Sequence, residues 1–440
     1  MGDKGIRDAR TLGVPKMLLL GFQHMFAMFG ATVLVPALTG LSVSATLLFA
    51  GLGTLLFHFL AKGKVPAFLG SSFAFIYGYK MIAPNGEAAL LPYACVGVAC
   101  AGLLYVILSA LFKYFGAKKV MRFFPPIVTG PIIICIGMTL ANSAINNCAA
   151  NWWIAILAIA VVVACNIWGK GMIKIVPILL GVLVSYVVAA LCGQVDFSKV
   201  ASAPWLGVPF TWDNTVFSLF GNADGALIVK AITAIMPIAL ATMVEHIGDM
   251  CAISSTVGEN YIANPGLHRT LLGDGIATSL AAIFGAPANT TYGENTGVLA
   301  LTKVYDPKVI RIAAVIAVIF SFSPKFAALV SAMPVATIGG VSLILYGMIS
   351  AVGVRNIVEN QVDFTKSRNV IIAALIMSLA LGVTFSSAGA VIIPLFGIEI
   401  HLSGLAVAAI VGILLNAILP GNDYEFGKSE QGDTAVNFKI

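Results

Sequence analysis

Two carboxylates stand inside apolar stretches of this sequence. Glu245 lies within IVKAITAIMPIALATMVEHIGDM, and Glu294 lies within the Gly-rich stretch GAPANTTYGENTGVLALTK. An ionisable side chain at membrane depth is costly, so it usually marks the path of a substrate or a proton. A carboxylate accepts hydrogen bonds when it is ionised and donates one when it is protonated. The two positions therefore predict a site for a small polar ligand, and the interrupted backbone around Glu294 is typical of a transporter.

Asp249 follows Glu245 by one helical turn, so both side chains share a face of the same helix. Two close carboxylates in an apolar span compete for ionisation, and one of them can hold a proton near neutral pH. We therefore predict that Glu245 and Asp249 couple proton movement to transport. Asp249 has a structural alternative, which is hydrogen bonding to nearby backbone. His246 points about 100° away from its neighbour Glu245, and we expect it to support the structure, together with His24 and Asn295.

Two short segments interrupt apolar helices and can position these groups. SSFAF (71–75) follows Gly70, TTYGE (290–294) follows Pro287, and both are rich in residues that favour strands. Extended backbone at membrane depth must find its hydrogen bonds within the protein. We predict that the segments pair as a short antiparallel ladder, and that the helix after each points its N-terminal N–H groups toward the centre. Ordinary helix kinks are the structural alternative.

The surrounding chain is that of a membrane protein. Of its 440 residues, 59% are hydrophobic and 10% are charged, whereas soluble domains carry about 25% charged residues. Stretches long enough to cross a bilayer, about 20 apolar residues each, can be drawn fourteen times. They cover residues 17–36, 43–61, 65–83, 91–112, 126–143, 152–169, 173–192, 226–251, 270–286, 291–304, 309–331, 334–353, 369–386 and 402–419. Asp274, near the cytoplasmic start of 270–286, is expected to cap its helix or to face water.

The basic residues predict the orientation of these spans. If the N-terminus is cytoplasmic and the spans alternate, all but four of the 25 Lys and Arg residues fall on the cytoplasmic side. The exceptions are Lys80, Lys199, Lys230 and Lys325. We expect a multi-pass protein of the cell membrane with both termini cytoplasmic. The net charge of +6 is then a topology signal and does not indicate nucleic-acid binding. The seven Cys residues show no CxxC spacing, so we expect no metal site and no cofactor.

The chain also repeats itself. Gln23-His24 aligns with Glu245-His246, SSFAF aligns with TTYGE, and paired Gly and Pro positions keep the same order with nearly constant spacing. Seven spans per half is an odd number, so the second half enters the membrane from the opposite side. The predicted fold is an all-α polytopic membrane protein with fourteen transmembrane segments in a 7+7 inverted repeat. It includes two short antiparallel β segments, in spans 3 and 10.

At these residues the chain resembles the nucleobase–ascorbate transporter family, also called nucleobase/cation symporter 2. The family motif is Gln, Glu or Pro, then Asn-x-Gly, four variable residues, Thr, and Lys, Arg or Gly. ENTGVLALTK at 294–303 matches it completely. QHMFAMFGATVLVP, PAFLGSSFAF, EHIGD, PGLHR, TTYGEN and GGVSLILYG also resemble bacterial uracil-transporting members, and the resemblance runs from about residue 15 to 420.

The resemblance implies two domains with different functions. A core domain would carry the substrate, and a gate domain would flank it and form a homodimer contact. In this sequence the parts would be 1–115 (core, spans 1–4), 116–225 (gate, spans 5–7 and the outer loop), 226–332 (core, spans 8–11), 333–420 (gate, spans 12–14) and 421–440 (cytoplasmic tail).

The resemblance also implies a substrate, uracil, and a set of residues that hold it. Carboxylates would come from Glu245 and Glu294, and backbone amides from Phe73 and Gly293. Further contacts would come from Tyr292, Tyr346 and Ala31. Some uracil-transporting members carry a His, linked to proton coupling, at the position of Asp249.

Proton-coupled uracil uptake has three alternatives. A symporter of the same family could carry a purine such as xanthine or urate. An anion transporter of the sulfate type has a similar fold, but two carboxylates aimed at one site disfavour an anionic substrate. A membrane-embedded enzyme is a third reading, and no HExxH, GxSxG or paired metal-ligand pattern supports it.

Overall fold

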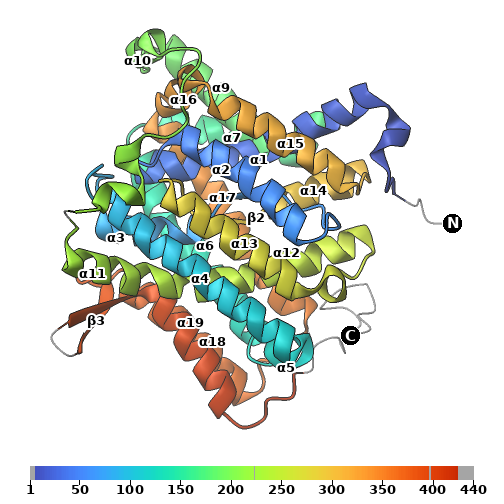
Figure 1. Cartoon of the computed structure of the whole chain (residues 1–440), viewed down its shortest axis with the longest axis vertical. Helices are drawn as coiled ribbons and strands as arrows, with labels where there is room; N and C mark the ends of the chain where they lie inside the picture. The colour runs from blue at the N-terminus through green and yellow to red at the C-terminus, as the bar shows by residue number, and fades with distance from the viewer. Residues whose placement is uncertain (1–4, 222, 396–397, 425–440) are drawn as a thin grey trace.

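The computed structural model describes residues 5–221, 223–395 and 398–424, and the chain there is mostly helical (Figure 1). The α-helices are α1 (Val14–Thr39), α2 (Val43–Leu60), α3 (Ile76–Ile82), α4 (Leu91–Phe115), α5 (Ala117–Met121), α6 (Pro126–Cys148), α7 (Trp152–Trp168), α8 (Met172–Ile175), α9 (Pro177–Leu191), α10 (Ser198–Ser202), α11 (Gly225–Ile235), α12 (Ala239–Val257), α13 (Leu267–Ile283), α14 (Gly293–Thr302), α15 (Pro307–Ser321), α16 (Pro324–Ser331), α17 (Val335–Glu359), α18 (Ser367–Thr384) and α19 (Gly404–Ile418).

Short polar side chains set where many of these helices begin. An N-cap side chain accepts hydrogen bonds from the first free N–H groups of its helix. Ser42, Asn151, Asp224, Asp306 and Ser403 do so for α2, α7, α11, α15 and α19. The sequence thus encodes the helix boundaries with local hydrogen bonds as well as with apolar length.

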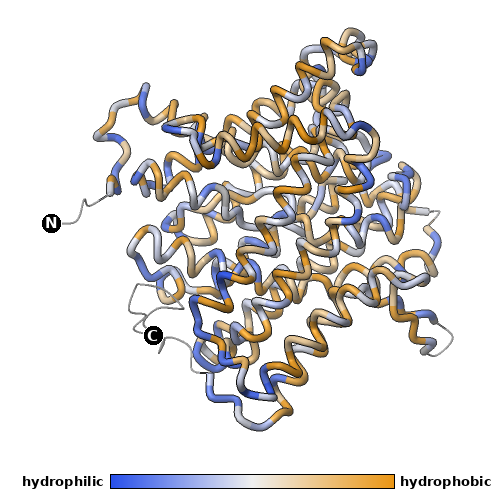
Figure 2. Tube along the Cα trace, turned by 180° about the vertical axis from the view of Figure 1, so that it is seen from behind, coloured by the Kyte–Doolittle hydropathy of each residue, from blue (hydrophilic) through white to orange (hydrophobic). Residues whose placement is uncertain are grey.

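Several of the helices are long and apolar enough to cross a membrane. In the described part of the chain seven qualify by length and composition, or eight if the bent pair α15 and α16 is one span. Each predicted span coincides with one or more helices, but helix length alone does not reproduce the count of fourteen. Hydrophobic residues run along the helices, and hydrophilic residues gather at helix ends and loops (Figure 2).

Some of the predicted spans are broken inside. The span predicted at 309–331 bends by 89° between α15 and α16, where Pro324 starts the second helix. The span predicted at 226–251 is divided into α11, a 3-10 turn (Met236–Ile238) and α12. Pro237 lies in that turn, and proline cannot supply the N–H that a continuous helix needs.

Two short antiparallel sheets accompany the helices. β1 (Leu69–Ser71) pairs with β2 (Asn289–Thr291), which confirms the predicted pairing with the strands shifted slightly toward the N-terminus. β3 (Ala390–Leu395) pairs with β4 (Ile398–Ser403) between α18 and α19, and this hairpin was not predicted. In Figure 1 the hairpin lies beside α11 at one edge of the molecule, and α5 lies at the opposite edge.

Helices from the two halves of the sequence interleave. α2 packs on α15, α4 packs on α13, and α6 packs on α17. Glycines permit close approach at these contacts: a Cβ on Gly137 of α6 would meet the carbonyl oxygen of Tyr346 in α17 at 2.1 Å. On α13 a Cβ on Gly275 would meet the carbonyl oxygen of Gly102 in α4 at 2.7 Å. The halves therefore share one packed interior.

Candidate functional site: the crossing of two short strands

The centre of the site is the ladder between β1 and β2. Leu69 faces Thr291, Gly70 faces Thr290, and Ser71 faces Asn289. The pairing extends at both ends, because the Ser72 N–H donates to the Ala288 carbonyl at 2.8 Å and the Tyr292 N–H donates to the Phe68 carbonyl at 3.0 Å. Two chain segments about half the sequence apart are thus held edge to edge.

Neighbouring helices satisfy the remaining backbone groups of the ladder. The Thr54 hydroxyl of α2 accepts from the Leu69 N–H at 2.9 Å and donates to the Leu69 carbonyl at 3.2 Å. On the other strand the Thr278 hydroxyl of α13 donates to the Asn289 carbonyl at 2.8 Å. The Asn289 side chain donates in turn to the Phe49 carbonyl at 2.9 Å. Extended backbone is tolerated at membrane depth only when the protein itself supplies such partners.

The Tyr292 side chain packs against the crossing and forms a hydrogen bond with it. Its hydroxyl donates to the Ser71 carbonyl at 2.8 Å, and the ring is buried. A Cβ placed on Gly70 would lie 2.5 Å from two atoms of this ring and 2.8 Å from the Thr32 hydroxyl. Position 70 therefore requires glycine because the Tyr292 ring occupies the space of a side chain. Tyr292 is also the residue before α14, so the same contact fixes where α14 begins.

Each strand leads into a helix that starts at the crossing. After β1, a 3-10 turn (Phe73–Phe75) continues into α3, and after β2, α14 starts at Gly293. The first N–H groups of a helix have no partner within it and carry a partial positive charge. Both helices therefore begin at the crossing, with their first backbone N–H groups next to the two strands.

A cavity of ≈ 720 Å³ opens beside the crossing. Its lining comes from α1, α9, α12, β2 and α14, from the first half of α6 and from the second half of α17. Carboxylate, hydroxyl and aromatic side chains reach it. We call the end with the exposed charged residues Lys174, Arg355 and Glu359, together with Asn360 and Tyr424, the mouth of the cavity. A mostly apolar cavity with a few convergent polar groups is typical of a site for a small ligand.

The structure brings most of the predicted contact residues to this cavity. Phe73, Glu245, Tyr292 and Gly293 line it, and so does Asp249, which is predicted to take part in proton coupling. The backbone of Glu294 continues α14 directly after Gly293. The side chain of Glu294 lies outside what the structure describes.

Two further residues that are predicted to contact the substrate, Tyr346 and Ala31, are buried and do not line the cavity. Tyr346 of α17 is buried and meets the Phe73 ring edge-on, with ring centroids 5.7 Å apart. Ala31 of α1 is fully buried, and neither residue is among the described residues that line the cavity. Tyr346 therefore contacts Phe73, which itself lines the cavity.

The Asp249 carboxylate belongs to a polar network across three elements. The Thr291 hydroxyl of β2 donates to Asp249 at 2.8 Å and lies 3.5 Å from Nδ1 of His246. Nδ1 of His246 is in turn 2.9 Å from a carboxylate oxygen of Asp274, and both side chains are fully buried. The expectation that Asp274 caps a helix end or faces water is wrong. α13 begins at Leu267, so Asp274 lies two turns inside it.

The other two residues predicted to support the structure also meet one another. The side-chain amide of Asn295 in α14 donates to the His24 carbonyl of α1 at 3.1 Å and lies 3.1 Å from the His24 ring. Both residues are buried. This contact ties α14 to α1 next to the crossing.

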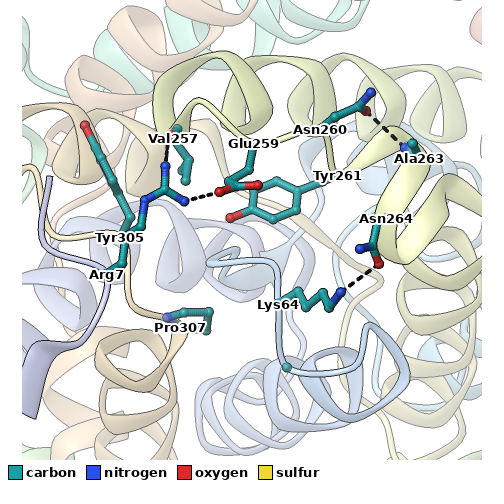
Figure 3. A pocket seen from close by; sticks show the side chains of 11 residues that line it. Arg7, Lys64, Val257, Glu259, Asn260, Tyr261, Ala263, Asn264, Tyr305 and Pro307 are labelled. Carbon is teal, nitrogen blue, oxygen red and sulfur yellow. Dashed lines mark hydrogen bonds and ion pairs between the residues drawn. The ribbon is translucent and has the colours of Figure 1, made fainter. Parts of the chain in front are cut away.

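A second pocket, of ≈ 620 Å³, lies where the N-terminal segment crosses the ends of α12 and α14 (Figure 3). Arg7 pairs there with Glu259 and also donates to the Val257 carbonyl at 3.0 Å, and Lys64 donates to Asn264 at 2.8 Å. Both cations thus already have partners. The polar residues of this pocket therefore hold chain segments together, and we do not assign a ligand to it.

Backbone pairing continues this tie along the segment after α14. The Ile6 N–H donates to the Lys303 carbonyl at 2.7 Å, and the Tyr305 N–H donates to the Ile6 carbonyl at 2.8 Å. Asp8 lies 3.4 Å from the Lys308 ammonium, and the hydrogen bond from Arg10 holds the pKa of Asp8 well below its usual value. Asp8 therefore stays ionised at neutral pH. We call residues 5–12 the N-terminal strap.

Solved structures with a similar fold come from anion transporters. The transmembrane domain of a cyanobacterial bicarbonate transporter, BicA, matches with a TM-score of 0.60 and 14% identity, over 94% of this chain and 99% of that chain. The structure of SLC26A9 matches with a TM-score of 0.63 and 12% identity, over 91% of this chain and 64% of that one. At these identities the likeness concerns the fold alone, which is that of a membrane transporter.

Sequence relatives are much closer. The uracil permease of Bacillus caldolyticus is 40% identical, over 94% of both chains. The uracil permease of Bacillus subtilis is 38% identical, over 99% of this chain and 98% of the relative, and that of Escherichia coli is 37% identical, over 91% and 90%. A family model described as "Permease family" matches residues 15–389. The chain is therefore a multi-pass membrane transporter that belongs to this permease family, as its motifs predicted.

Proposed function

We propose that this protein takes up uracil across the cytoplasmic membrane by proton-coupled symport, with alternating access to one central site. The observation that supports this most is the cavity at the strand crossing, which carboxylates and helix N-termini reach together. Uracil is a flat ring with two N–H donors and two carbonyl acceptors. It needs acceptors, donors and an aromatic surface at one place, and the cavity offers all three.

Each group has an assigned role in this proposal. The Glu245 and Glu294 carboxylates accept from the uracil N–H groups, and the backbone amides of Phe73 and Gly293 donate to its carbonyls. The Phe73 ring covers one face of the base. Tyr346 holds that ring by its edge contact. Tyr292 forms part of the cavity wall, and Ala31 packs behind that wall.

Proton coupling is assigned to Glu245 and Asp249. They lie one turn apart on α12 and both line the cavity. A proton taken up with uracil and released afterwards would link uptake to the inward pH gradient. His24, His246 and Asn295 hold the neighbouring elements in place through the contacts described above.

The proposed architecture is fourteen spans in a 7+7 inverted repeat, with both termini cytoplasmic. Spans 1–4 and 8–11 form the core domain and spans 5–7 and 12–14 the gate domain, which also forms a homodimer contact. The cavity supports this division, because α12 and α14 of the proposed core domain and α6 and α17 of the proposed gate domain all line it. The mutual packing of α6 and α17 supports the repeat.

The resemblance to bicarbonate-transporter structures does not change the substrate proposal. Two carboxylates on α12 face the cavity, and they repel an anionic substrate. A neutral base that donates hydrogen bonds is the better partner for them. A purine would also meet this requirement, so the experiment must distinguish the two classes of base.

The test is a substrate panel in proteoliposomes, with and without a pH gradient. We expect uptake of labelled uracil, competition by unlabelled uracil, weaker competition by xanthine or urate, and loss of uptake with a protonophore. Uptake that follows a sodium gradient and ignores pH would refute the proton assignment. Preferential competition by xanthine would move the assignment to a purine symporter.

A variant tests the site independently of uptake. Glu294→Gln keeps the shape of the side chain and removes the charged acceptor. A hydrogen bond to a charged group contributes about 1.5–3 kcal/mol, so we expect uracil binding by calorimetry to weaken by roughly ten-fold or more. Near-native binding would contradict the role of Glu294. Glu359→Gln at the cavity mouth is the control, because it changes the same chemistry on α17, away from the crossing.

A further inference from the structure

The cavity is open at one end of the helix bundle. It follows α6 only from its first residues to Ile133, and it follows α17 from Leu345 to its last residues. On α12 it follows the helix from Val244 to Thr256. The opposite ends of these helices lie away from the mouth, and contacts of another kind are found there.

At that opposite end, α3 reaches across to the α6 and α18 side of the molecule. The half-buried Lys80 ammonium donates to the Ser143 hydroxyl, near the end of α6, at 2.8 Å. The Tyr77 hydroxyl lies 2.9 Å from the Gly389 carbonyl and 3.1 Å from the Thr384 carbonyl, and it donates to these acceptors. Thr384 ends α18, and Gly389 directly precedes β3.

The β3–β4 hairpin adds a second bridge at the same end. β4 packs against α11, as Figure 1 also shows for the hairpin and this helix. The His401 N–H of β4 donates to the Thr233 hydroxyl of α11 at 3.3 Å. The hairpin thus contacts α11, and the residue before it contacts α3.

These contacts connect directly to the strand crossing. α3 follows the Phe73–Phe75 turn without a break, so Tyr77 is one helical turn from Phe73. Phe73 lines the cavity and meets Tyr346 of α17. A shift of the crossing relative to α6, α17 and α18 must therefore move Lys80 relative to Ser143 and Tyr77 relative to the carbonyls of Thr384 and Gly389.

We propose that Tyr77, Lys80 and β4 form a latch that seals the end of the cavity opposite its mouth. We call these residues the outer latch. It must open whenever the cavity opens on that side. All acceptors are neutral hydroxyl or carbonyl groups, and such bonds are individually weak enough to break and re-form within a transport cycle. This inference rests on the proposed transport function.

The first experiment weakens the latch and measures which end is open. Cys251 of α12 lines the cavity and is partly exposed. We expect its alkylation by a maleimide in purified protein, followed by peptide mass spectrometry, to slow in Tyr77→Phe/Lys80→Met. Loss of these hydrogen bonds shifts the population by roughly ten-fold toward a state with the mouth closed. The matched control is Tyr114→Phe/Lys113→Met, the same changes at the end of α4.

The second experiment closes the latch permanently. A disulfide in Thr233→Cys/His401→Cys would join α11 to β4. We expect it to abolish uracil uptake reversibly, with recovery on reduction, while the oxidised protein still binds uracil in calorimetry. The two single-cysteine variants are the controls.

Two outcomes would overturn the latch. One is a cross-linked protein that transports as fast as the reduced one. The other is a Tyr77→Phe/Lys80→Met variant that binds uracil and shows unchanged alkylation of Cys251. The alkylation readout needs no substrate, so it separates failure of the latch from failure of the uracil assignment, which would appear as loss of uracil binding in the unmodified protein.

Discussion

Replacement of Gly70 by alanine is the most direct perturbation of the strand crossing. The new methyl group would lie 2.5 Å from the Tyr292 ring and 2.8 Å from the Thr32 hydroxyl. Real Cβ contacts are not this short, and neither neighbour can move freely. The Tyr292 ring is buried, and its hydroxyl is tied to the Ser71 carbonyl. The ring must therefore shift, and the start of α14 must shift with it.

The size of the effect follows from the cost of overpacking. An extra methylene in a well-packed interior costs about 1–3 kcal/mol. If this whole free-energy cost must be overcome to bring α14 back to its binding position, each 1.4 kcal/mol of it weakens uracil binding about ten-fold. We therefore expect Gly70→Ala to reduce uracil affinity by roughly five-fold to 150-fold. Part of the cost can instead lower the thermal stability.

The assay is uracil binding by calorimetry, combined with thermal unfolding of the same preparation. Gly382→Ala in α18 is the matched control, because a Cβ there meets nothing within 4 Å. A second comparison tests the mechanism: Gly70→Ala added to Tyr292→Leu should cost less than Gly70→Ala alone. The reasoning is refuted if Gly70→Ala binds uracil and unfolds like the unmodified protein.

Three further predictions concern the charged groups. Asp249→Asn should flatten the pH dependence of uptake more than it weakens uracil binding at equilibrium, and an unchanged pH profile would make Asp249 structural. Asp274→Ala should lower the thermal unfolding temperature, since it removes the buried polar partner of His246 and an unsatisfied buried group costs about 1–3 kcal/mol; unfolding like the unmodified protein would show that the contact with His246 contributes little. Arg7→Ala should change stability by about 1 kcal/mol or less, because its pair with Glu259 is half exposed, and a much larger loss would indicate that the N-terminal strap carries more than this pair.

The crossing could be predicted because the sequence carries two independent signals for it. The repeat relates SSFAF to TTYGE, and backbone interrupted at membrane depth must pair with something. Together they point to mutual pairing, which the structure has with β1 at 69–71 and β2 at 289–291. The strands end at Ser71 and Thr291 because Ser72 and Tyr292 are the N-cap residues of the following helices, and only the N–H groups of these two residues still extend the pairing.

Other features depend on information that local sequence patterns do not carry. The role of Asp274 was missed because its span was drawn from residue 270, whereas α13 starts at Leu267 and buries this carboxylate beside His246. The N-terminal strap depends on partners some 300 residues away, which no local pattern reveals. The sequence of β4, in contrast, does carry a local pattern that indicates a strand. Alternating residues in IEIHLS at 398–403 are typical of a strand.

The β1–β2 ladder imposes an order on the biosynthesis of this protein. Ser71 and Tyr292, which meet at the ladder, are 221 residues apart. At about 5–20 residues per second, the ribosome delivers the second strand roughly 10–40 s after the first. During that time lipid can offer β1 no hydrogen bonds. Thr54 lies only 15 residues before Leu69 and bonds both its N–H and its carbonyl. The first half of the chain thus contains a hydrogen-bonding partner for the Leu69 backbone, the Thr54 hydroxyl. This partner can satisfy part of β1 until the second half of the chain has been synthesised.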